Sequence, residues 1–408
     1  MLLRKLNDAQ LTYCTNVHPG ETLLAVREML RRHVTAVKAN VSPNERFGVG
    51  LRLAAAAADS LAEPAELERF KAELESLGLY CFTFNGFPYG AFHATRVKER
   101  VYLPDWLDLE RVRYTQVLAR VLGELLPLGV SGSISTVPGC FKPHADSVEA
   151  ERTMAANLID TVAVLVDIAR SSGRHIALAL EPEPECFLET TEEAVRFFEQ
   201  RLFSREARER LVASADVEPS EAERLIRRHL GVCLDTCHAS VEFESPLAAW
   251  RRLQAAGISV PKVQISAGLR LAPSTPERVE ALRGFADGVY LHQTVVQSEA
   301  GLTRYLDLPE VLATPSAIGD EWRVHFHVPI FLRELGPFES TQPDLLPLLA
   351  ELATVPDCPH LEVETYTWDV LPEQFRNVPL EDAIARELRF VQDTLASALN
   401  ARHATERI

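Results

Sequence analysis

Two acidic residues stand directly after short apolar segments of this chain. Glu181 follows Ile176–Leu180, and Asp235 follows Val232–Leu234. Because fully buried parallel strands read as continuous apolar runs, we expect each acid to stand at the carboxyl end of such a strand. In a (β/α)8 barrel, side chains at these ends line the active site. Carboxylate oxygens in that position would suit a divalent metal ion.

Further polar residues extend this candidate metal site. His238 follows Asp235 by three residues, and Gln264 interrupts an otherwise apolar strand-like segment. A buried glutamine needs partners, so Gln264 is a metal ligand, a substrate contact or an accident of packing. Glu362 and Glu364 stand two apart in a later strand-like segment and would share one face. Glu364, at the end of that segment, is the better ligand candidate.

Other polar groups are candidates for contacting a substrate. His325 and His327 stand two apart, a spacing that places both on one face of a strand. Glu183 belongs to a run of three acids within five residues, which repel one another unless a cation is near. Each group also has a structural reading, as a buried core histidine or as an acid that caps a helix. The candidate substrate contacts are His18, Asn85, Glu183, His292, His325 and His327.

Strand-like and helix-like segments alternate along the chain, which argues for a parallel sheet with crossover helices. We therefore predict one α/β domain over residues 1–408, a (β/α)8 TIM barrel. Its eight expected strands are Leu11–Thr15, Gly48–Leu53, Leu79–Phe84, Val130–Ser135, Ile176–Leu180, Val232–Leu234, Lys262–Ser266 and Leu361–Glu364.

Two segments exceed what a barrel needs. Residues 204–228 are highly charged, and we expect them to form one or two inserted helices. Residues 270–330 contain two further strand-like segments, 288–296 and 322–330. We expect these two to pair antiparallel in an insertion over the barrel mouth. Thr190 and Glu193 have the spacing of a capping box that begins a helix.

Charge and composition exclude some functions. The chain has 42 Lys and Arg against 58 Asp and Glu, a formal net charge of −16, which opposes binding to nucleic acid or to an anionic membrane. Its seven cysteines include no CxxC pair and are expected to be reduced thiols of a cytoplasmic protein. We find no signal-peptide pattern and no long apolar run, so we expect no stable membrane insertion. No nucleotide-binding glycine motif is present.

The strand-end motifs resemble those of the xylose isomerase-like TIM barrels, which include sugar isomerases, ketose 3-epimerases and the endonuclease IV group. The matching motifs are Leu180–Pro182, Leu234–His238 and Glu364–Tyr366. The resemblance implies one divalent ion (Mn, Mg, Co or Zn) and, as its ligands, Glu181, Asp235, Gln264 and Glu364. It also implies that Glu181 and Glu364 act as acid and base, and that His238 contacts the substrate.

One position departs from that pattern, because the epimerases carry a histidine where Gln264 stands. Three readings stay open: Gln264 binds through its oxygen, His327 or His292 substitutes for the histidine, or the metal site is degraded.

Longer motifs resemble the EboE family of metabolite-traffic proteins across nearly the whole chain. They are Tyr13–Gly20, Phe84–Gly90, Leu180–Glu185, Tyr290–Gln293, Trp322–Pro329 and Glu362–Trp368. Those proteins are encoded beside a UbiA-like prenyltransferase. The resemblance implies handling of a small, prenylated metabolite and a functional link to that enzyme, but it does not define a reaction.

Three functions are compatible with these motifs. The first is a metal-dependent isomerase or epimerase of a polyol or sugar-like metabolite, in which Glu181 and Glu364 move the proton next to a carbonyl. The second is a non-catalytic metabolite-binding or traffic protein on the same barrel. The third is an endonuclease IV-like phosphodiesterase, which the net charge and the small number of matching histidines disfavour.

Overall fold

The computed structural model describes residues 1–3, 6, 9–93, 98–145, 147–286, 288–314, 318–371 and 378–405. Eight parallel strands form a barrel, which confirms the predicted fold class. They pair in the order β2-β15-β8-β7-β6-β5-β4-β3, and a short strand β1 (Leu2–Leu3) runs antiparallel beside β2. The barrel strands are β2 (Ala9–Tyr13), β3 (Phe47–Arg52), β4 (Leu79–Asn85), β5 (Gly132–Thr136), β6 (Ile176–Leu180), β7 (Leu230–Asp235), β8 (Ser259–Ile265) and β15 (His360–Val363).

The barrel closes between β2 and β3 with help from a side chain. The two strands meet in a single parallel bridge between Cys14 and Gly50. Beside it, the Gly50 N–H donates a hydrogen bond of 3.3 Å to Thr12 Oγ1. A Cβ atom at Gly50 would lie 1.7 Å from Glu362 Oε1, so only glycine fits there. The Thr12 hydroxyl therefore accepts a hydrogen bond that a backbone carbonyl would accept between two regularly paired strands.

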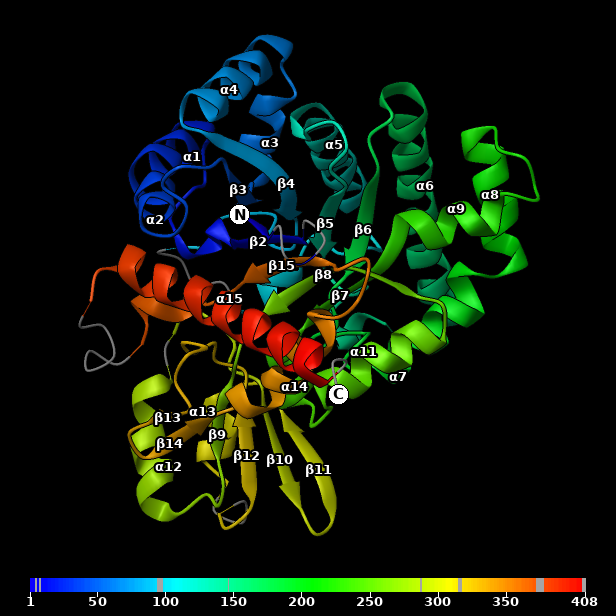
Figure 1. Cartoon of the computed structure of the whole chain (residues 1–408). Helices are drawn as coiled ribbons and strands as arrows, with labels where there is room; N and C mark the ends of the chain where they lie inside the picture. Colours follow the sequence, from blue (N-terminus) through cyan, green and yellow to red (C-terminus); the bar gives the residue numbers. More distant parts are fainter. Residues whose placement is uncertain are drawn as a thin grey trace.

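Helices follow the strands and cover the barrel (Figure 1). Local sequence sets where some of them begin. Thr190 and Glu193 form the predicted capping box of α7 (Thr191–Phe197), and Ser147 caps α6 (Val148–Ser172). In the described part of the chain, no helix is long and apolar enough to cross a bilayer. Before β8 the helices are α1 (Leu23–Met29), a π-helical turn (Leu30–Val34), α2 (Thr35–Val41), α3 (Ala55–Leu61), α4 (Pro64–Ser76), α5 (Leu109–Leu125), α6 (Val148–Ser172), α7 (Thr191–Phe197), a second π-helical turn (Phe198–Leu202), α8 (Arg205–Ala215), α9 (Ala222–His229), α10 (Thr236–Val241) and α11 (Pro246–Ala255). The charged segment 204–228 thus contains two helices, α8 and α9, as the sequence predicted.

The chain between β8 and β15 forms a second, antiparallel sheet, whose yellow strands lie together beside the barrel in Figure 1. The predicted antiparallel pairing is confirmed, because Thr294 faces Val324 and Gln297 faces Glu321. Residues 287 and 315–317 of the predicted insertion lie outside the described residues. The strand order is β11-β10-β12-β9-β14-β13. The bounds are β9 (Leu269–Leu271), β10 (Thr294–Ser298), β11 (Gly301–Tyr305), β12 (Glu321–Val324), β13 (Glu334–Leu335) and β14 (Phe338–Ser340), with helices α12 (Pro276–Leu282), α13 (Leu308–Leu312) and α14 (Gln342–Leu352), and α15 (Leu380–Thr405) follows β15.

The strand predicted over residues 322–330 was too long, because β12 ends at Val324. Beyond it, the His325 N–H donates to Gln293 O and the Val328 N–H donates to Ala267 O, both at 2.8 Å. These residues therefore cross from the second sheet toward β8 and do not continue a ladder. The strand predicted over 288–296 also begins only at Thr294. His325 and the histidine two residues later thus lie on irregular backbone.

A buried ion pair lies inside the barrel. Lys262 Nζ of β8 is 2.6 Å from Glu362 Oε2 of β15, and neither side chain is exposed. Burial alone would lower the pKa of Lys262, but the Glu362 carboxylate raises it above its ordinary value. The two opposite charges therefore neutralise each other inside the barrel.

Candidate functional site

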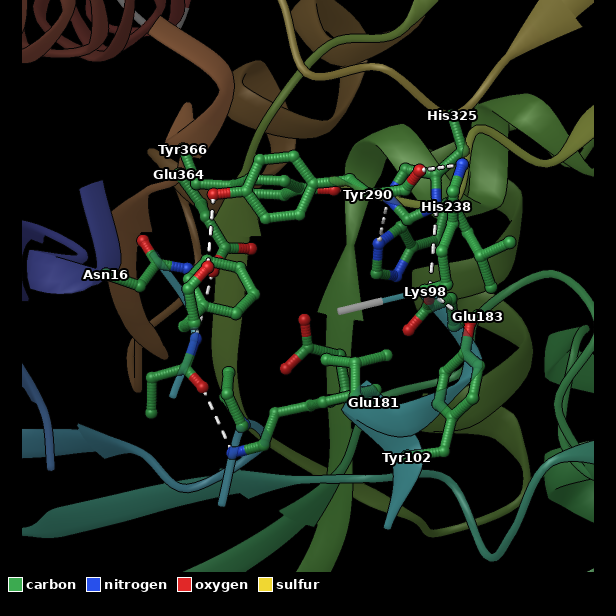
Figure 2. Close-up of a pocket in the computed structure, with 16 residues that line it drawn as sticks. Asn16, Lys98, Tyr102, Glu181, Glu183, His238, Tyr290, His325, Glu364 and Tyr366 are labelled. Atoms are coloured by element: carbon green, nitrogen blue, oxygen red, sulfur yellow. Dashed lines mark hydrogen bonds and ion pairs between the residues drawn. The ribbon is translucent and has the colours of Figure 1, made fainter. Parts of the chain in front are cut away.

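Three of the predicted acids meet at the carboxyl ends of β6, β7 and β15. Glu181, Asp235 and Glu364 each place one oxygen within 4.8 Å of the other two. None of the three is more than 4% exposed. They converge because parallel strands present their carboxyl ends at the same face of a barrel. Figure 2 shows the side chains of Glu181 and Glu364 turned toward the pocket.

Only one of the two carboxylate oxygens of Asp235 accepts hydrogen bonds from the described residues. Its Oδ1 accepts hydrogen bonds from Ser266 Oγ at 2.7 Å and from the His238 N–H at 2.9 Å, the latter as the cap of α10. Its Oδ2 and the Oε2 of Glu181 are buried and have no hydrogen-bond partner among the described residues. An unsatisfied buried carboxylate oxygen is costly, so these two atoms indicate a missing cation or proton.

Glu364 is anchored by two amides from distant strands. Its Oε1 accepts a hydrogen bond of 2.7 Å from Asn16 Nδ2 and one of 2.9 Å from Asn85 Nδ2. Asn16 follows β2 and Asn85 ends β4, so the first strands of the barrel fix an acid that belongs to the last. Asn85 therefore reaches the site, although its contact is with Glu364.

The carboxylates raise one another's pKa. Burial is the main cause for Glu181, followed by the charges of Glu364 and Asp235, and together they hold its pKa well above the ordinary value. Burial and Asp235 do the same for Glu364. Lys262 opposes these shifts, but its ammonium is already paired. Three converging carboxylates, two of which carry an oxygen without a hydrogen-bond partner among the described residues, fit a divalent ion that prefers oxygen ligands, such as Mg²⁺ or Mn²⁺.

Gln264, predicted as a fourth ligand, lies in β8 in register with Asp235 on one side and Glu362 on the other. Its side chain is fully buried, and neither its oxygen nor its nitrogen has a hydrogen-bond partner among the described residues. An unpaired buried amide costs about 1–3 kcal/mol, so a ligand for this group is expected. Its part in metal binding stays a prediction.

Histidines join the site from α10 and from the insertion. Asp235, His238 and His327 offer ligand atoms within 4.8 Å of one another. His327, one of the two proposed substitutes for a strand histidine, therefore lies close to Asp235. The other, His292, points its Nδ1 at the carbonyl of His325 at 3.2 Å and is not among the residues that line the pocket.

A pocket of about 530 Å³, measured to include its open mouth, lies over the carboxylates. One part of its wall is polar, and the rest is formed by aromatic and aliphatic side chains (Figure 2). Three predicted substrate contacts, Asn85, Glu183 and His325, belong to the wall. The other lining residues are Asn16, Phe87, Pro88, Phe92, Lys98, Val101, Tyr102, Glu181, His238, Tyr290, Leu291, Glu364 and Tyr366.

Glu183 is the pocket acid best suited to exchange protons at neutral pH. Its Oε1 accepts hydrogen bonds from Tyr102 Oη at 2.9 Å and from Gln293 Nε2 at 3.2 Å. Burial raises the pKa of Glu183 to about 7, because these two hydrogen bonds offset only part of the desolvation. A group with such a pKa can both give and accept a proton near pH 7.

His18 lies outside the pocket wall. Its Nε2 is 3.1 Å from the hydroxyl of Tyr13, and its ring stacks on His33 with 4.6 Å between centroids. Asn16, two residues earlier, lines the pocket and was missed, although a polar residue directly after the first strand was a usable signal. Tyr102 was also missed, and it carried no such signal, because it lies in a 3-10 turn far from any strand end.

The sequence matches no protein-family model and no curated protein, so the resemblance to the EboE family stays a prediction. Solved structures do match. A xylose isomerase-like TIM barrel protein from Mycobacterium smegmatis, in complex with magnesium, is similar over 96% of this chain and 98% of that chain, with 11% identity and a TM-score of 0.51. An L-ribulose 3-epimerase matches over 97% and 98%, with 12% identity and a TM-score of 0.49. The probable 3-DHS dehydratase AsbF from Bacillus anthracis matches over 94% and 98%, with 12% identity and a TM-score of 0.46. At such low identity, the likeness to the magnesium-bound protein shows the fold alone: the chain folds as a TIM barrel similar to that xylose isomerase-like protein.

Proposed function

We propose that this protein is a metal-dependent isomerase or epimerase that moves a proton next to the carbonyl of a small polyol-like metabolite. One observation carries the proposal: three buried carboxylates place oxygens within 4.8 Å of one another at the open end of the barrel. Glu181, Asp235 and Glu364 would hold the ion. Its contribution would be to polarise a substrate carbonyl and the neighbouring hydroxyl.

The two glutamates supply the acid and the base. Glu181 faces the pocket, and its Oε2, which has no hydrogen-bond partner in the described part of the chain, is available to accept a proton. Glu364 is held on the opposite side by Asn16 and Asn85, which both bind Oε1 and so fix the direction of the carboxylate. In the metal-free protein, burial and the neighbouring carboxylates raise the pKa of both groups.

The pocket wall indicates the kind of substrate. Phe92, Tyr290 and Tyr366 pack against one another, with 5.2–5.6 Å between their ring centroids, and face the same cavity as the acids. A substrate with a hydroxylated, carbonyl-bearing head and an apolar tail would fill both parts, as a prenylated metabolite would. The functional link to a UbiA-like prenyltransferase stays a prediction of the resemblance.

A second candidate function is metabolite binding or traffic without turnover. It is favoured by Gln264, since β8 supplies an amide with two unpartnered atoms where the epimerases supply a histidine. A protein of this kind would bind the metabolite and exchange no proton with it. An endonuclease-like role is the weakest of the three, because a net charge of −16 opposes a phosphate backbone.

Proton exchange with D₂O separates the first two functions. The full-length protein, supplied with Mg²⁺ or Mn²⁺, is incubated in D₂O with a panel of ketoses and oxo-polyols, and deuterium at the carbon next to the carbonyl is followed by NMR. We expect wild type and the exposed control Glu75→Gln to incorporate deuterium into a member of the panel, and Glu181→Gln and Glu364→Gln to lose this activity. Full exchange in both site variants would refute the mechanism, and metabolite binding without any exchange would favour traffic.

A further inference from the structure

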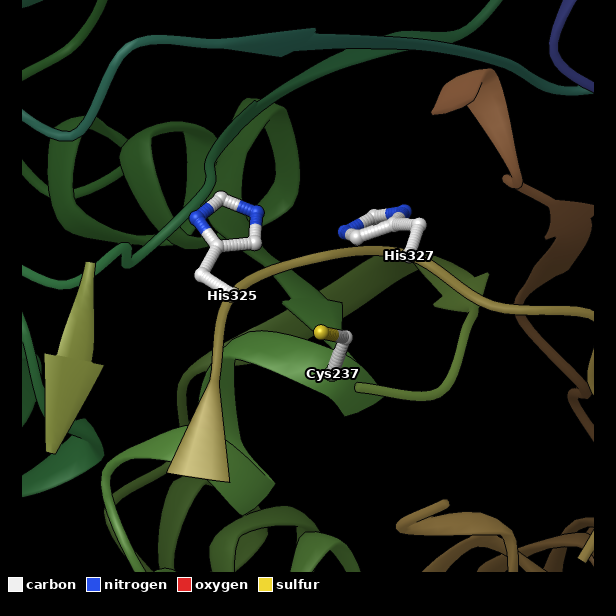
Figure 3. A group of neighbouring side chains, drawn as sticks. All are labelled: Cys237, His325 and His327. Carbon is white, nitrogen blue, oxygen red and sulfur yellow. The ribbon is translucent and has the colours of Figure 1, made fainter. Parts of the chain in front are cut away.

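Three imidazole rings face one another where the insertion meets the barrel. His238 comes from α10, and His325 and His327 follow β12. The ring centroids of His238 and His325 are 4.5 Å apart, and those of His325 and His327 are 5.2 Å apart. All three side chains are buried. Figure 3 shows the rings of His325 and His327 turned toward each other, with the Cys237 thiol beside them.

Each ring is fixed by an oxygen at its Nδ1 atom. A carbonyl oxygen only accepts hydrogen bonds, so each Nδ1 must carry the hydrogen. The three contacts are His238 Nδ1 to Pro182 O at 3.0 Å, His325 Nδ1 to Gln293 Oε1 at 2.8 Å, and His327 Nδ1 to Glu364 O at 2.7 Å.

The orientation of the Gln293 amide follows from its other contacts. Its Nε2 donates to Tyr102 Oη at 2.7 Å and to Pro184 O at 3.1 Å. If the amide were turned, its oxygen would face the Pro184 carbonyl, and two acceptors would meet. The atom that faces His325 is therefore the oxygen.

A neutral imidazole that carries its hydrogen on Nδ1 presents a lone pair at Nε2. The Nε2 atoms of His238 and His325 are 3.1 Å apart, so two lone pairs face each other. The Nε2 of His327 is buried and has no hydrogen-bond partner among the described residues. The Tyr366 hydroxyl is 3.5 Å from His325 Nε2, at the outer limit of a hydrogen bond. These lone pairs need a hydrogen-bond donor or a cation among them.

A metal cation would satisfy the lone pairs of all three rings at once. Metal-binding histidines usually donate their other ring N–H to a carbonyl or carboxylate, as all three rings do.

We propose that the Nε2 atoms of His238, His325 and His327 bind a second divalent cation of the zinc class. Two nitrogens about 2.0–2.1 Å from one tetrahedral zinc ion lie about 3.3 Å apart, close to the separation of His238 and His325. Cys237 places its Sγ within 4.8 Å of ring nitrogens of His325 and His327 and is the fourth ligand. It binds as a thiolate, and its proton is released to solvent.

This site differs in chemistry from the carboxylate site. Nitrogen and sulfur ligands favour zinc or cobalt, whereas oxygen ligands suit magnesium or manganese. The cation would join the barrel, through α10, to the insertion, and it would replace the direct substrate contact predicted for His238. Because the two sites use different atoms, either proposal can fail without the other.

The test counts cobalt in the full-length protein. After removal of bound metal with a chelator, the double variant Glu181→Gln/Glu364→Gln is titrated with Co²⁺, so that the carboxylate site does not contribute. Elemental analysis gives the number of bound ions, and absorption reports tetrahedral coordination and thiolate ligation. In the same background, His325→Asn and Cys237→Ser alter the proposed ligands. His229→Asn is the matched control, since it is a buried histidine outside the set.

We expect one Co²⁺ per chain with a tetrahedral spectrum, unchanged in His229→Asn. His325→Asn should weaken Co²⁺ binding by at least about tenfold, the lower end of the loss seen when a group that merely supports a ligand is removed. Cys237→Ser should abolish the thiolate-to-cobalt band, which keeps the test decisive even if His325→Asn does not fold. The proposal is overturned if the double variant takes up no Co²⁺, or if binding and spectrum are the same in all variants.

Discussion

Replacing Glu181 with glutamine should stabilise the metal-free protein, although it removes a functional group. The change deletes one of three negative charges packed within 4.8 Å. Two unit charges 4.8 Å apart repel by about 3.5 kcal/mol at an effective dielectric constant of about 20. The raised pKa of Glu181 means that partial protonation already relieves some of this repulsion. We therefore expect a net gain of about 1–3 kcal/mol in the free energy of unfolding at pH 8.

The pH dependence has a definite sign. A carboxyl group whose pKa is raised in the folded state contributes most below its unfolded pKa, near 4.5, and this contribution is lost as the pH rises toward the raised value. The metal-free wild type should therefore lose stability between about pH 5 and pH 8 relative to Glu181→Gln. If wild type and Glu181→Gln lose stability equally over this pH range, the three acids do not repel one another in the metal-free site.

Divalent metal should reverse the order of stability. Ligand at 100 times its Kd stabilises a protein by about 2.7 kcal/mol, and the variant that lacks a ligand should gain less from Mn²⁺ than wild type does. Scanning calorimetry with and without chelator measures both effects. Each kcal/mol of stability shifts the melting temperature by about 1 °C in a chain of this length. The exposed substitution Glu75→Gln controls for the change in net charge. The reasoning fails if metal-free Glu181→Gln is less stable than wild type at pH 8, or if Mn²⁺ stabilises both proteins equally.

Three further predictions concern the surroundings of the site. Lys262→Met leaves the buried Glu362 carboxylate unpaired and should lower the free energy of unfolding by about 3–5 kcal/mol, whereas adding Glu362→Leu should restore much of it in urea titrations. Burial raises the pKa of Glu387 from 4.5 to about 7, so wild type should lose roughly 3 kcal/mol of stability between pH 4.5 and 7 that Glu387→Gln does not lose; equal slopes would contradict this. Phe92→Ala should weaken binding of metabolites with an apolar tail, measured by calorimetry, while proton exchange of a short polyol is unchanged.

The strand-end acids could be predicted from the sequence because the rule behind them is geometric. An apolar run that stops at Glu181 or Asp235 places the acid at the carboxyl end of a buried strand, and a barrel brings such ends together. Glu364 follows from the same rule at the last strand. The convergence of these oxygens is observed, whereas their metal-binding and catalytic roles stay predictions.

The parts that escaped prediction depend on contacts between distant segments. Lys262 looks like a polar residue at a strand start, and only the structure shows that it forms an ion pair with Glu362 on the neighbouring strand. His325 and His327 were assigned to a strand that ends before them, yet Gln293 O and Glu364 O fix them against the barrel. Local periodicity carries no information on such bonds, because their partners come from other elements.

The central claim is that three buried carboxylates form one divalent cation site. Calorimetric titration of the metal-free protein with Mn²⁺ tests it most directly, with elemental analysis of the product. The account predicts one manganese ion per wild-type chain, retained in Glu75→Gln and lost in Glu181→Gln and Glu364→Gln. A wild-type protein that binds no manganese, or site variants that bind it as tightly as wild type, would contradict the account.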